Sequence, residues 1–390
     1  MSLLLRGARV VVGDGSPALA RADVRIVDAR IDAVEATLVP LPGERTIEVA
    51  GRVLLPGFVD AHTHALWAGD RLEEFEQRQR GATYLEILKA GGGIWSTVRS
   101  VRAASQTELT ERLQARLEVM LREGTTTVEV KSGYGLSLEH ELKMLRAIRA
   151  AAQGFRGTVV ATALLGHALD PADPDFVRRT VEQTLPAIHE EFPEVAVDAY
   201  CEQGAFSLEA CRQLLLAAQQ LGHPLRLHAD QFHRLGAVEL ALELGIRSLD
   251  HLEATPPEAL ERLARAGVFG VMLPASGFHV DGRYANARAF LDAGGKLVLA
   301  SNCNPGTAPT SSMPLVIALA VRHLRLTAAE AITATTQRAA ELLGFADRGA
   351  VRVGQRADLL LLRHADERQL GYELGGDPVD HVVCGGELVK

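Results

Sequence analysis

Short apolar runs alternate with helical patterns through the middle of the chain. Near-continuous apolar strands that alternate with helices indicate a parallel sheet covered on both faces. Eight strand–helix units over about 250 residues predict a (β/α)₈ TIM barrel. The expected strands are Val53–His62, Thr125–Val130, Thr158–Leu165, Val195–Tyr200, Leu225–His228, Arg247–His251, Val268–Leu273 and Lys296–Asn302. The expected helices span 107–123, 137–153, 174–191, 207–221, 234–244, 256–266, 284–293 and 327–343.

The two ends of the chain resemble each other and differ from the middle. Short apolar runs punctuated by turn residues predict antiparallel strands. We therefore expect one small β-sandwich domain built from both termini. These terminal runs lie at 3–12, 22–28, 31–36, 46–50 and 350–390. The predicted division of the chain is 1–52 for the first part of the sandwich, 53–345 for the barrel and 346–390 for the second part.

One connection is too long for a scaffold loop. From His64 to Val98 the chain reads HALWAGDRLEEFEQRQRGATYLEILKAGGGIWSTV. Connections beyond about 12–15 residues are usually functional or disordered, and the aromatic Trp67 and Trp95 argue against disorder. We expect a short helix around 83–89 within this excursion.

Composition and charge narrow the class of protein. The chain has 390 residues, of which 47% are hydrophobic and 23% charged, and its net charge at pH 7 is −8. These values exclude a coiled coil, collagen or bulk disorder and give no electrostatic footprint for nucleic acid. We see no signal peptide and no run near the roughly 20 apolar residues that span a bilayer. The four cysteines lack CxxC spacing, so we expect a cytoplasmic protein with no nucleic-acid or membrane partner.

Histidines stand at the ends of several expected strands. His62 and His64 close the first one, and residues two apart on a strand share a face. His167, His228 and His251 follow the third, fifth and sixth strands. A single histidine at such a place is usually structural. Four strand ends of one barrel that carry histidine converge on one mouth, which predicts a metal with an open position for hydrolytic chemistry.

Several segments together carry a family resemblance. PGFVDAHTH, with a histidine near the fifth and sixth strands, is similar to the amidohydrolase superfamily. The long excursion, together with VEVKSGYGL, LLGHA, LHADQ, LDHLE and NPGTAPT, resembles the imidazolonepropionase family within it. The resemblance covers nearly the whole chain. It implies metal-dependent hydrolysis of the cyclic amide C–N bond of 4-imidazolone-5-propanoate to N-formimidoyl-L-glutamate, a step of histidine degradation.

The resemblance also implies roles for individual residues and for partners. It predicts one divalent metal per chain, zinc or iron, a small anionic substrate and a homodimer. The implied metal ligands are His62, His64, His228 and Asn302. The implied substrate-binding residues are Arg71, Tyr84, Tyr134, His167, Gln231, Asn304, Gly306 and Thr307. The implied catalytic residues are His251, Gln231 and Asn302.

Asn302 departs from the family pattern, which has an aspartate at this position. An amide is a weaker ligand than a carboxylate and accepts no proton usefully. Three neutral histidines leave a divalent site at about +2, and a zinc held by three histidines lowers the pKa of its water to ≈ 7. His251 could then serve as the base. The sequence leaves open a natural variant, an engineered substitution and a degraded paralogue.

Two other functions stay open at this stage. A related deaminase of a purine or pyrimidine ring shares the pattern HxH…His…His, and the segment from Arg71 to Arg99 with NPGT separates the two families. A catalytically impaired relative that binds an imidazolone-like ligand is the second, and Asn302 is its support.

Overall fold

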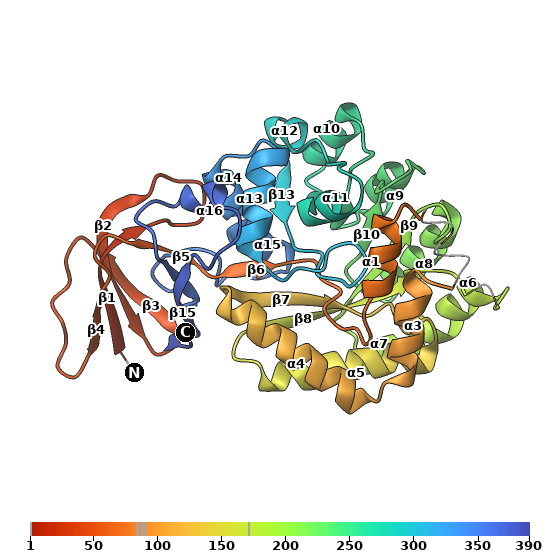
Figure 1. Cartoon of the computed structure of the whole chain (residues 1–390), viewed down its shortest axis with the longest axis horizontal. Helices are drawn as coiled ribbons and strands as arrows, with labels where there is room; N and C mark the ends of the chain where they lie inside the picture. The colour runs from red at the N-terminus through yellow and green to blue at the C-terminus, as the bar shows by residue number, and fades with distance from the viewer. Residues whose placement is uncertain (1, 83–85, 87–90, 171) are drawn as a thin grey trace.

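The structure, a computed structural model, describes residues 2–82, 86, 91–170 and 172–390. Within these residues, eight parallel strands follow one another in chain order around a nearly closed sheet (Figure 1). The predicted barrel is therefore confirmed. Its strands are β6 (Phe58–Asp60), β7 (Thr125–Lys131), β8 (Thr158–Gly166), β9 (Ala196–Cys201), β10 (Arg226–Ala229), β11 (Ser248–His251), β12 (Phe269–Met272) and β13 (Lys296–Leu299).

The gap between β6 and β13 is bridged just beyond the strands. Asn302 donates its backbone N–H to the carbonyl of His62 at 3.0 Å, and His64 donates to the carbonyl of Cys303 at 3.0 Å. Asp60 accepts from the backbone N–H of Ser301 at 3.0 Å. These bonds hold the segment after β13 against the one after β6. They complete the ring of the barrel at its carboxyl end, where the sequence predicts the site.

The first expected strand is divided in two. Val53–Pro56 forms β5, which pairs with strands of the terminal sheet, and only β6 joins the barrel. The break falls at Gly57, where a Cβ would lie 2.3 Å from Oγ1 of Thr126. Glycine is needed here because the side chain of Thr126 occupies the space that a Cβ would take. A continuous apolar run hid this break from the sequence pattern.

The terminal strands form a separate mixed sheet with its own apolar core, at the left in Figure 1. Strand β14 lies between β5 and β15, so the C-terminal segment completes a sheet begun by the N-terminal one. This confirms the expected unit made from both termini, while the exact domain boundaries stay a prediction. The strands are β1 (Ser2–Val10), β2 (Leu19–Val27), β3 (Arg30–Glu35), β4 (Arg45–Glu48), β5, β14 (Leu359–Leu362), β15 (Val379–Cys384) and β16 (Glu387–Leu388).

The helices expected between the strands cover the barrel. Ser105 and Ser137 begin α4 and α5, because each side chain accepts a backbone N–H of the first turn. The segment 174–191 is divided by a π-helical turn, η1. These elements are α4 (Gln106–Arg122), α5 (Leu138–Gly154), α6 (Phe176–Arg179), η1 (Thr180–Thr184), α7 (Leu185–Glu191), α8 (Leu208–Gln220), α9 (Ala237–Leu244), α10 (Pro257–Arg265), α12 (Ala287–Asp292), α14 (Ala328–Thr335) and α15 (Gln337–Leu342).

Further helices were not expected. Helix α1 lies in the long excursion, and α3 begins in it. Helix α1 contacts α11, because Nη2 of Arg78 lies 3.1 Å from Nε2 of His279. The helix expected around 83–89 falls outside the described residues except for Glu86. No helix within the described ranges is long and apolar enough to cross a membrane. The additional helices are α1 (Leu72–Gln79), α3 (Ile94–Ala103), α11 (Pro274–Val280), α13 (Met313–His323) and α16 (Gln369–Tyr372).

Candidate metal centre and substrate site

Three histidines meet at the carboxyl end of the barrel strands. His62 and His64 follow β6 and His228 lies in β10, and their candidate ligand atoms lie within 4.8 Å of one another. All three side chains are buried. Burial lowers the pKa of each imidazole well below its ordinary value of 6.5. The rings are therefore neutral at pH 7 and keep the lone pair that a metal requires.

The donor atoms fit a single metal ion. Nε2 of His64 lies 3.3 Å from Nε2 of His228. Two nitrogens bound to one tetrahedral zinc at about 2.0–2.1 Å are separated by roughly 3.4 Å, so the measured spacing matches. Nε2 of His62 and Oδ1 of Asn302 are buried and have no hydrogen-bond partner within the described residues. Buried polar atoms rarely stay unpaired, and a cation would satisfy both.

Two buried carboxylates support the histidines from behind. His62 lies with Nδ1 2.6 Å from an Asp250 oxygen, and His228 with Nδ1 3.1 Å from an Asp198 oxygen. Such partners fix the ring orientation and the tautomer that leaves Nε2 free. Lys131 bonds Asp198 at 2.9 Å. Neither aspartate is among the site residues predicted from the sequence, although each stands in a barrel strand where an apolar residue is usual.

The charges behind the histidines form a closed network. Lys131 also bonds Glu129 at 2.8 Å, and Arg226 bonds Asp250 at 2.7 Å and lies 3.4 Å from Glu129. All five of these side chains are at most 3% exposed. Buried charges are tolerated only when they are paired in this way. The network holds three carboxylates against two cations, which places one net negative charge beside the neutral histidines.

Tyr134 and His167 line one side of the cluster. The ring of His167 stacks on His64 with centroids 5.0 Å apart, and Tyr134 lies 6.0 Å from His64 and 5.2 Å from His167. His167 Nδ1 lies 2.9 Å from the carbonyl of Gly133, which accepts its proton. Burial lowers the pKa of His167 to about 4, so its neutral ring presents Nε2 as an acceptor. The structure thus brings both predicted substrate-binding residues to the predicted metal ligands.

Gln231 lies at the same mouth and is held by a tyrosine. The hydroxyl of Tyr200 donates to Oε1 of Gln231 at 2.8 Å, and the Tyr200 ring lies 5.9 Å from that of His228. A side-chain amide can donate and accept hydrogen bonds, but it neither takes up nor releases a proton at neutral pH. Gln231 is therefore suited to orienting a ligand. Tyr200 was missed by the sequence analysis. Its position at the carboxyl end of a barrel strand was the signal that could have found it.

Arg71 begins helix α1 and lies against the loop that follows β13. Its guanidinium pairs with Glu74 and lies 3.4 Å from the hydroxyl of Thr97. A Cβ on Gly306 would lie 3.4 Å from Nη1 of Arg71, which is van der Waals distance, so this loop lies directly against the guanidinium. Arg71 also acts on the pKa of Tyr134, which burial raises. The predicted cation therefore lies between α3 and the loop that follows β13.

The loop NPGT is folded around one amide. Oδ1 of Asn304 accepts the backbone N–H groups of Gly306 and Thr307 at 2.9 and 2.7 Å. Its Nδ2 donates to the hydroxyl of Thr307 at 2.9 Å. These contacts make Asn304 the residue that shapes the loop, and they place Thr307 3.5 Å from Nδ2 of Asn302. Tyr84, the remaining predicted substrate residue, lies outside the described residues.

Strained backbone is concentrated at these strand ends. Asp230, His251, Leu252 and Asn302 have φ angles of 53°, 88°, 73° and 56°. Non-glycine residues in this region cost on the order of 1–3 kcal/mol each and persist where the surroundings determine them. All four are buried at the mouth of the barrel. Such clustering is typical of a functional site.

The comparisons with known proteins agree with this geometry. A model described as "Amidohydrolase family" matches residues 67–390. Imidazolonepropionase of Herpetosiphon aurantiacus is 42% identical, with 100% of this chain and 97% of that protein covered. Imidazolonepropionase of Symbiobacterium thermophilum is 44% identical, with 99% and 92% covered. The chain belongs to the imidazolonepropionase family. It is thereby also a member of the amidohydrolases and a hydrolase by family.

Solved structures support the fold of this imidazolonepropionase-family chain. A triazine hydrolase from Arthobacter aurescens has a TM-score of 0.75 at 21% identity, with 100% of this chain and 94% of that chain covered. N-isopropylammelide isopropylaminohydrolase from Burkholderia multivorans has a TM-score of 0.74 at 21% identity, with 100% and 98% covered. At this identity the likeness concerns the fold alone. The imidazolonepropionase relatives, at twice that identity, disfavour the ring-deaminase alternative.

Proposed function

We propose that the chain hydrolyses 4-imidazolone-5-propanoate to N-formimidoyl-L-glutamate in histidine degradation. One observation carries the proposal: a cluster of three buried, neutral histidines lies beside Tyr134, and the guanidinium of Arg71 lies against Gly306 in the loop that follows β13. The substrate joins a propionate to a cyclic amide, and the site offers a cation at one end and metal ligands at the other. The 42% identity to the imidazolonepropionase of Herpetosiphon aurantiacus, which covers 100% of this chain, supports the proposal.

Binding and orientation fall to this chain's own side chains. Arg71 would hold the propionate, because its planar fork matches a carboxylate. Tyr134, His167 and the loop shaped by Asn304 would fix the imidazolone ring between the cation and the histidines. Holding a substrate in the reactive geometry supplies several kcal/mol of the barrier. Gln231, bonded by Tyr200, would orient the ring by hydrogen bonds.

His62, His64 and His228 would hold one divalent metal, with Asn302 beside them. Such an ion polarises a carbonyl and lowers the pKa of bound water. The water oxygen adds to the ring carbonyl carbon, and the ring C–N bond then breaks. A base has to take a proton from that water and return it to the leaving nitrogen. We assign this role to His251, because Asn302 lacks a carboxylate and Gln231 is an amide.

The finer features of the proposal are the metal, the assembly and the compartment. Zinc or iron both suit imidazole ligands, at one ion per chain. We propose a homodimer in the cytoplasm, on the resemblance to the family. Metal analysis of the purified chain and light scattering test the first two.

The decisive test is turnover of freshly prepared 4-imidazolone-5-propanoate with metal content measured on the same sample. We expect turnover with about one metal per chain, which would mean that Asn302 is tolerated. Guanine, cytosine and adenosine serve as competing substrates, and faster turnover of any of them would overturn the proposal. Metal and ligand binding without turnover would instead establish the impaired relative.

A further inference from the structure

His251 and Glu253 form a buried pair at the carboxyl end of β11. Nδ1 of His251 lies 3.3 Å from Oε1 of Glu253, and the two side chains are 4% and 6% exposed. The backbone between them is left-handed at His251 and again at Leu252. Leu252 donates to the carbonyl of Ala229 at 3.1 Å, which holds this turn against β10. The strained turn folds Glu253 back onto the imidazole.

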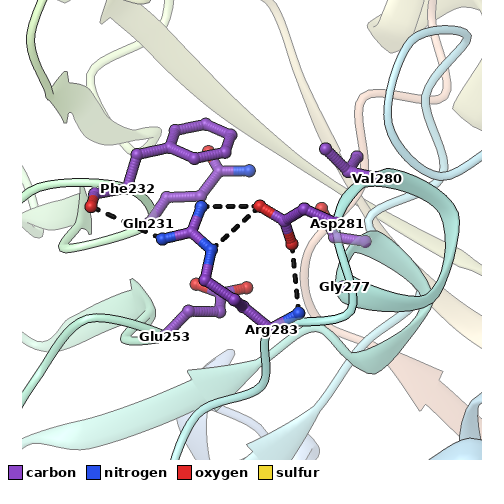
Figure 2. A pocket seen from close by; sticks show the side chains of 8 residues that line it. Gln231, Phe232, Glu253, Gly277, Val280, Asp281 and Arg283 are labelled. Carbon is purple, nitrogen blue, oxygen red and sulfur yellow. Dashed lines mark hydrogen bonds and ion pairs between the residues drawn. The ribbon is translucent and has the colours of Figure 1, made fainter. Parts of the chain in front are cut away.

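The other oxygen of Glu253 is left without a partner. Oε2 is buried and makes no hydrogen bond within the described residues. Glu253 lines a pocket with Gln231 and Arg283, yet the guanidinium of Arg283 pairs with Asp281 at 2.6 Å (Figure 2). A buried carboxylate is costly unless a proton or positive charge comes to it. The neighbour placed to bring one is His251.

The imidazole of His251 lies between this carboxylate and the metal ligands. Its ring centroid is 6.0 Å from that of His62 and 5.6 Å from that of His228. With the proton of Nδ1 directed at Glu253, Nε2 holds the lone pair. A carboxylate that orients a histidine and offsets its charge is a recurrent arrangement in hydrolases. Neither Asn302 nor Gln231 provides a carboxylate here, so Glu253 has the acidic group that these positions lack.

We propose that Glu253 is the positioning residue that makes His251 the base of this chain. The inference rests on the proposed function and deepens it. As the water oxygen bonds to the carbonyl carbon, Nε2 of His251 takes one proton, and Glu253 offsets the imidazolium charge. The same proton passes to the ring nitrogen when the C–N bond breaks. The second proton of the water leaves to solvent as the new carboxylic acid ionises.

A double-mutant cycle on the metal-loaded, full-length chain tests the proposal. Glu253→Gln should lower kcat by about 10–100-fold and leave KM within about threefold, because the group acts through a base and does not touch substrate. In the His251→Ala background the same change should cost nothing further. Glu258→Gln, an exposed glutamate in the first turn of α10, is the matched control and should leave kcat unchanged.

Equal losses from Glu253→Gln in both backgrounds would overturn the proposal, since a merely structural role costs the same with or without His251. A change confined to KM would overturn it as well. Nitrogen-15 spectra of the histidine rings give a second readout, independent of turnover. The His251 signal, assigned by its loss in His251→Asn, should show the Nδ1–H tautomer, and Glu253→Leu should abolish that preference.

The two proposals fail in different ways. If the unmodified chain does not turn over the imidazolone, the proposed function falls, while the tautomer of His251 still decides whether Glu253 orients it. If turnover is present and the tautomer is Nε2–H, the proposed function holds and the role of Glu253 is overturned.

Discussion

Asn302 shows how one amide alters the chemistry open to a site. Its left-handed backbone suits asparagine and aspartate alike, and its buried Oδ1 has no hydrogen-bond partner in the part of the chain that the structure describes. The position therefore accepts a carboxylate without any change of backbone. Compared with an aspartate, the amide lacks a negative charge next to the three histidines. It also lacks a group that can accept a proton.

Restoring the carboxylate should raise turnover. We expect Asn302→Asp to increase kcat by about tenfold or more, since a positioned carboxylate adds a second base. The measurement is kcat at saturating imidazolone, with metal content determined on each preparation. Asn286→Asp is the control, because Asn286 caps α12 and aspartate caps as well. A fall in kcat at equal metal content would contradict the expectation.

Arg71 is the residue on which substrate affinity should depend. Arg71→Ala should raise KM by roughly 10–100-fold, because a charge-assisted bond to the propionate is lost. Arg71→Lys should be intermediate, since an ammonium lacks the planar fork. Arg112→Ala, at an exposed ion pair on α4, serves as control. An unchanged KM in Arg71→Ala would place the propionate elsewhere.

At the scale of elements, the ends of the barrel strands carry the site. The sequence predicts that four histidines converge at this end of the barrel. His62 and His64 are two residues apart and so share a face of a strand, while His228 and His251 each follow an apolar run. Strand β11 shows what could not be foreseen. Its Asp250 is buried and lies 2.6 Å from Nδ1 of His62. The backbone after Asp250 is left-handed at His251 and Leu252, and no local pattern in the sequence predicts this.

The parts that escaped prediction share a physical cause. Buried charges such as Asp198 and Arg226 have the same sequence appearance as polar strand residues, and only pairing in space reveals them. Helices α1 and α3 lie in an excursion whose pattern is set by contacts with other loops, as Arg78 shows at α11. Local periodicity carries no information about such contacts.

The support of β11 for the metal can be measured. Asp250→Asn should weaken metal binding by about 10–100-fold, because His62 loses the carboxylate that orients it. Competition with a chromophoric chelator gives the affinity. Ser248→Ala, which removes a bond to Asp250 at 2.7 Å but leaves its charge, should have a smaller effect in the same direction. Asp292→Asn, an exposed pair on α12, is the control, and equal affinities throughout would contradict the assignment.

At the scale of the whole molecule, buried histidines couple stability to pH. The folded pKa of His167 is about 4 and lies below the ordinary value of 6.5. Between these values the unfolded chain binds a proton that the folded chain refuses. The contribution of His167 to the free energy of unfolding of the metal-free protein should therefore fall as pH drops from 6.5 to 4, by at most about 1.4 kcal/mol per pH unit. Above pH 6.5 the effect vanishes.

Urea unfolding of the chelator-treated protein at several pH values measures this slope. The three histidines of the candidate metal centre, with pKa values well below 6.5, add to it in the same direction. His167→Gln should reduce the slope of the unfolding free energy against pH. The part of the slope that comes from His62, His64 and His228 should remain. Carboxyl groups with a raised folded pKa, such as Asp60 at about 7, change stability in the opposite direction, so the comparison with His167→Gln decides the test. Equal slopes in the unmodified chain and in His167→Gln would show that this ring is protonated in the folded chain.

The terminal sheet has a consequence for how the molecule is made. Leu359 of β14 pairs with Pro56 of β5, and β5 leads directly into the strand that presents His62. During synthesis on the ribosome, the edge of β5 that pairs with β14 has no partner until almost the whole chain has emerged. Such distant pairings form slowly, and an open edge invites pairing with other chains. Trimming the last strands would therefore show as aggregation and poor yield before any defect in chemistry could be measured.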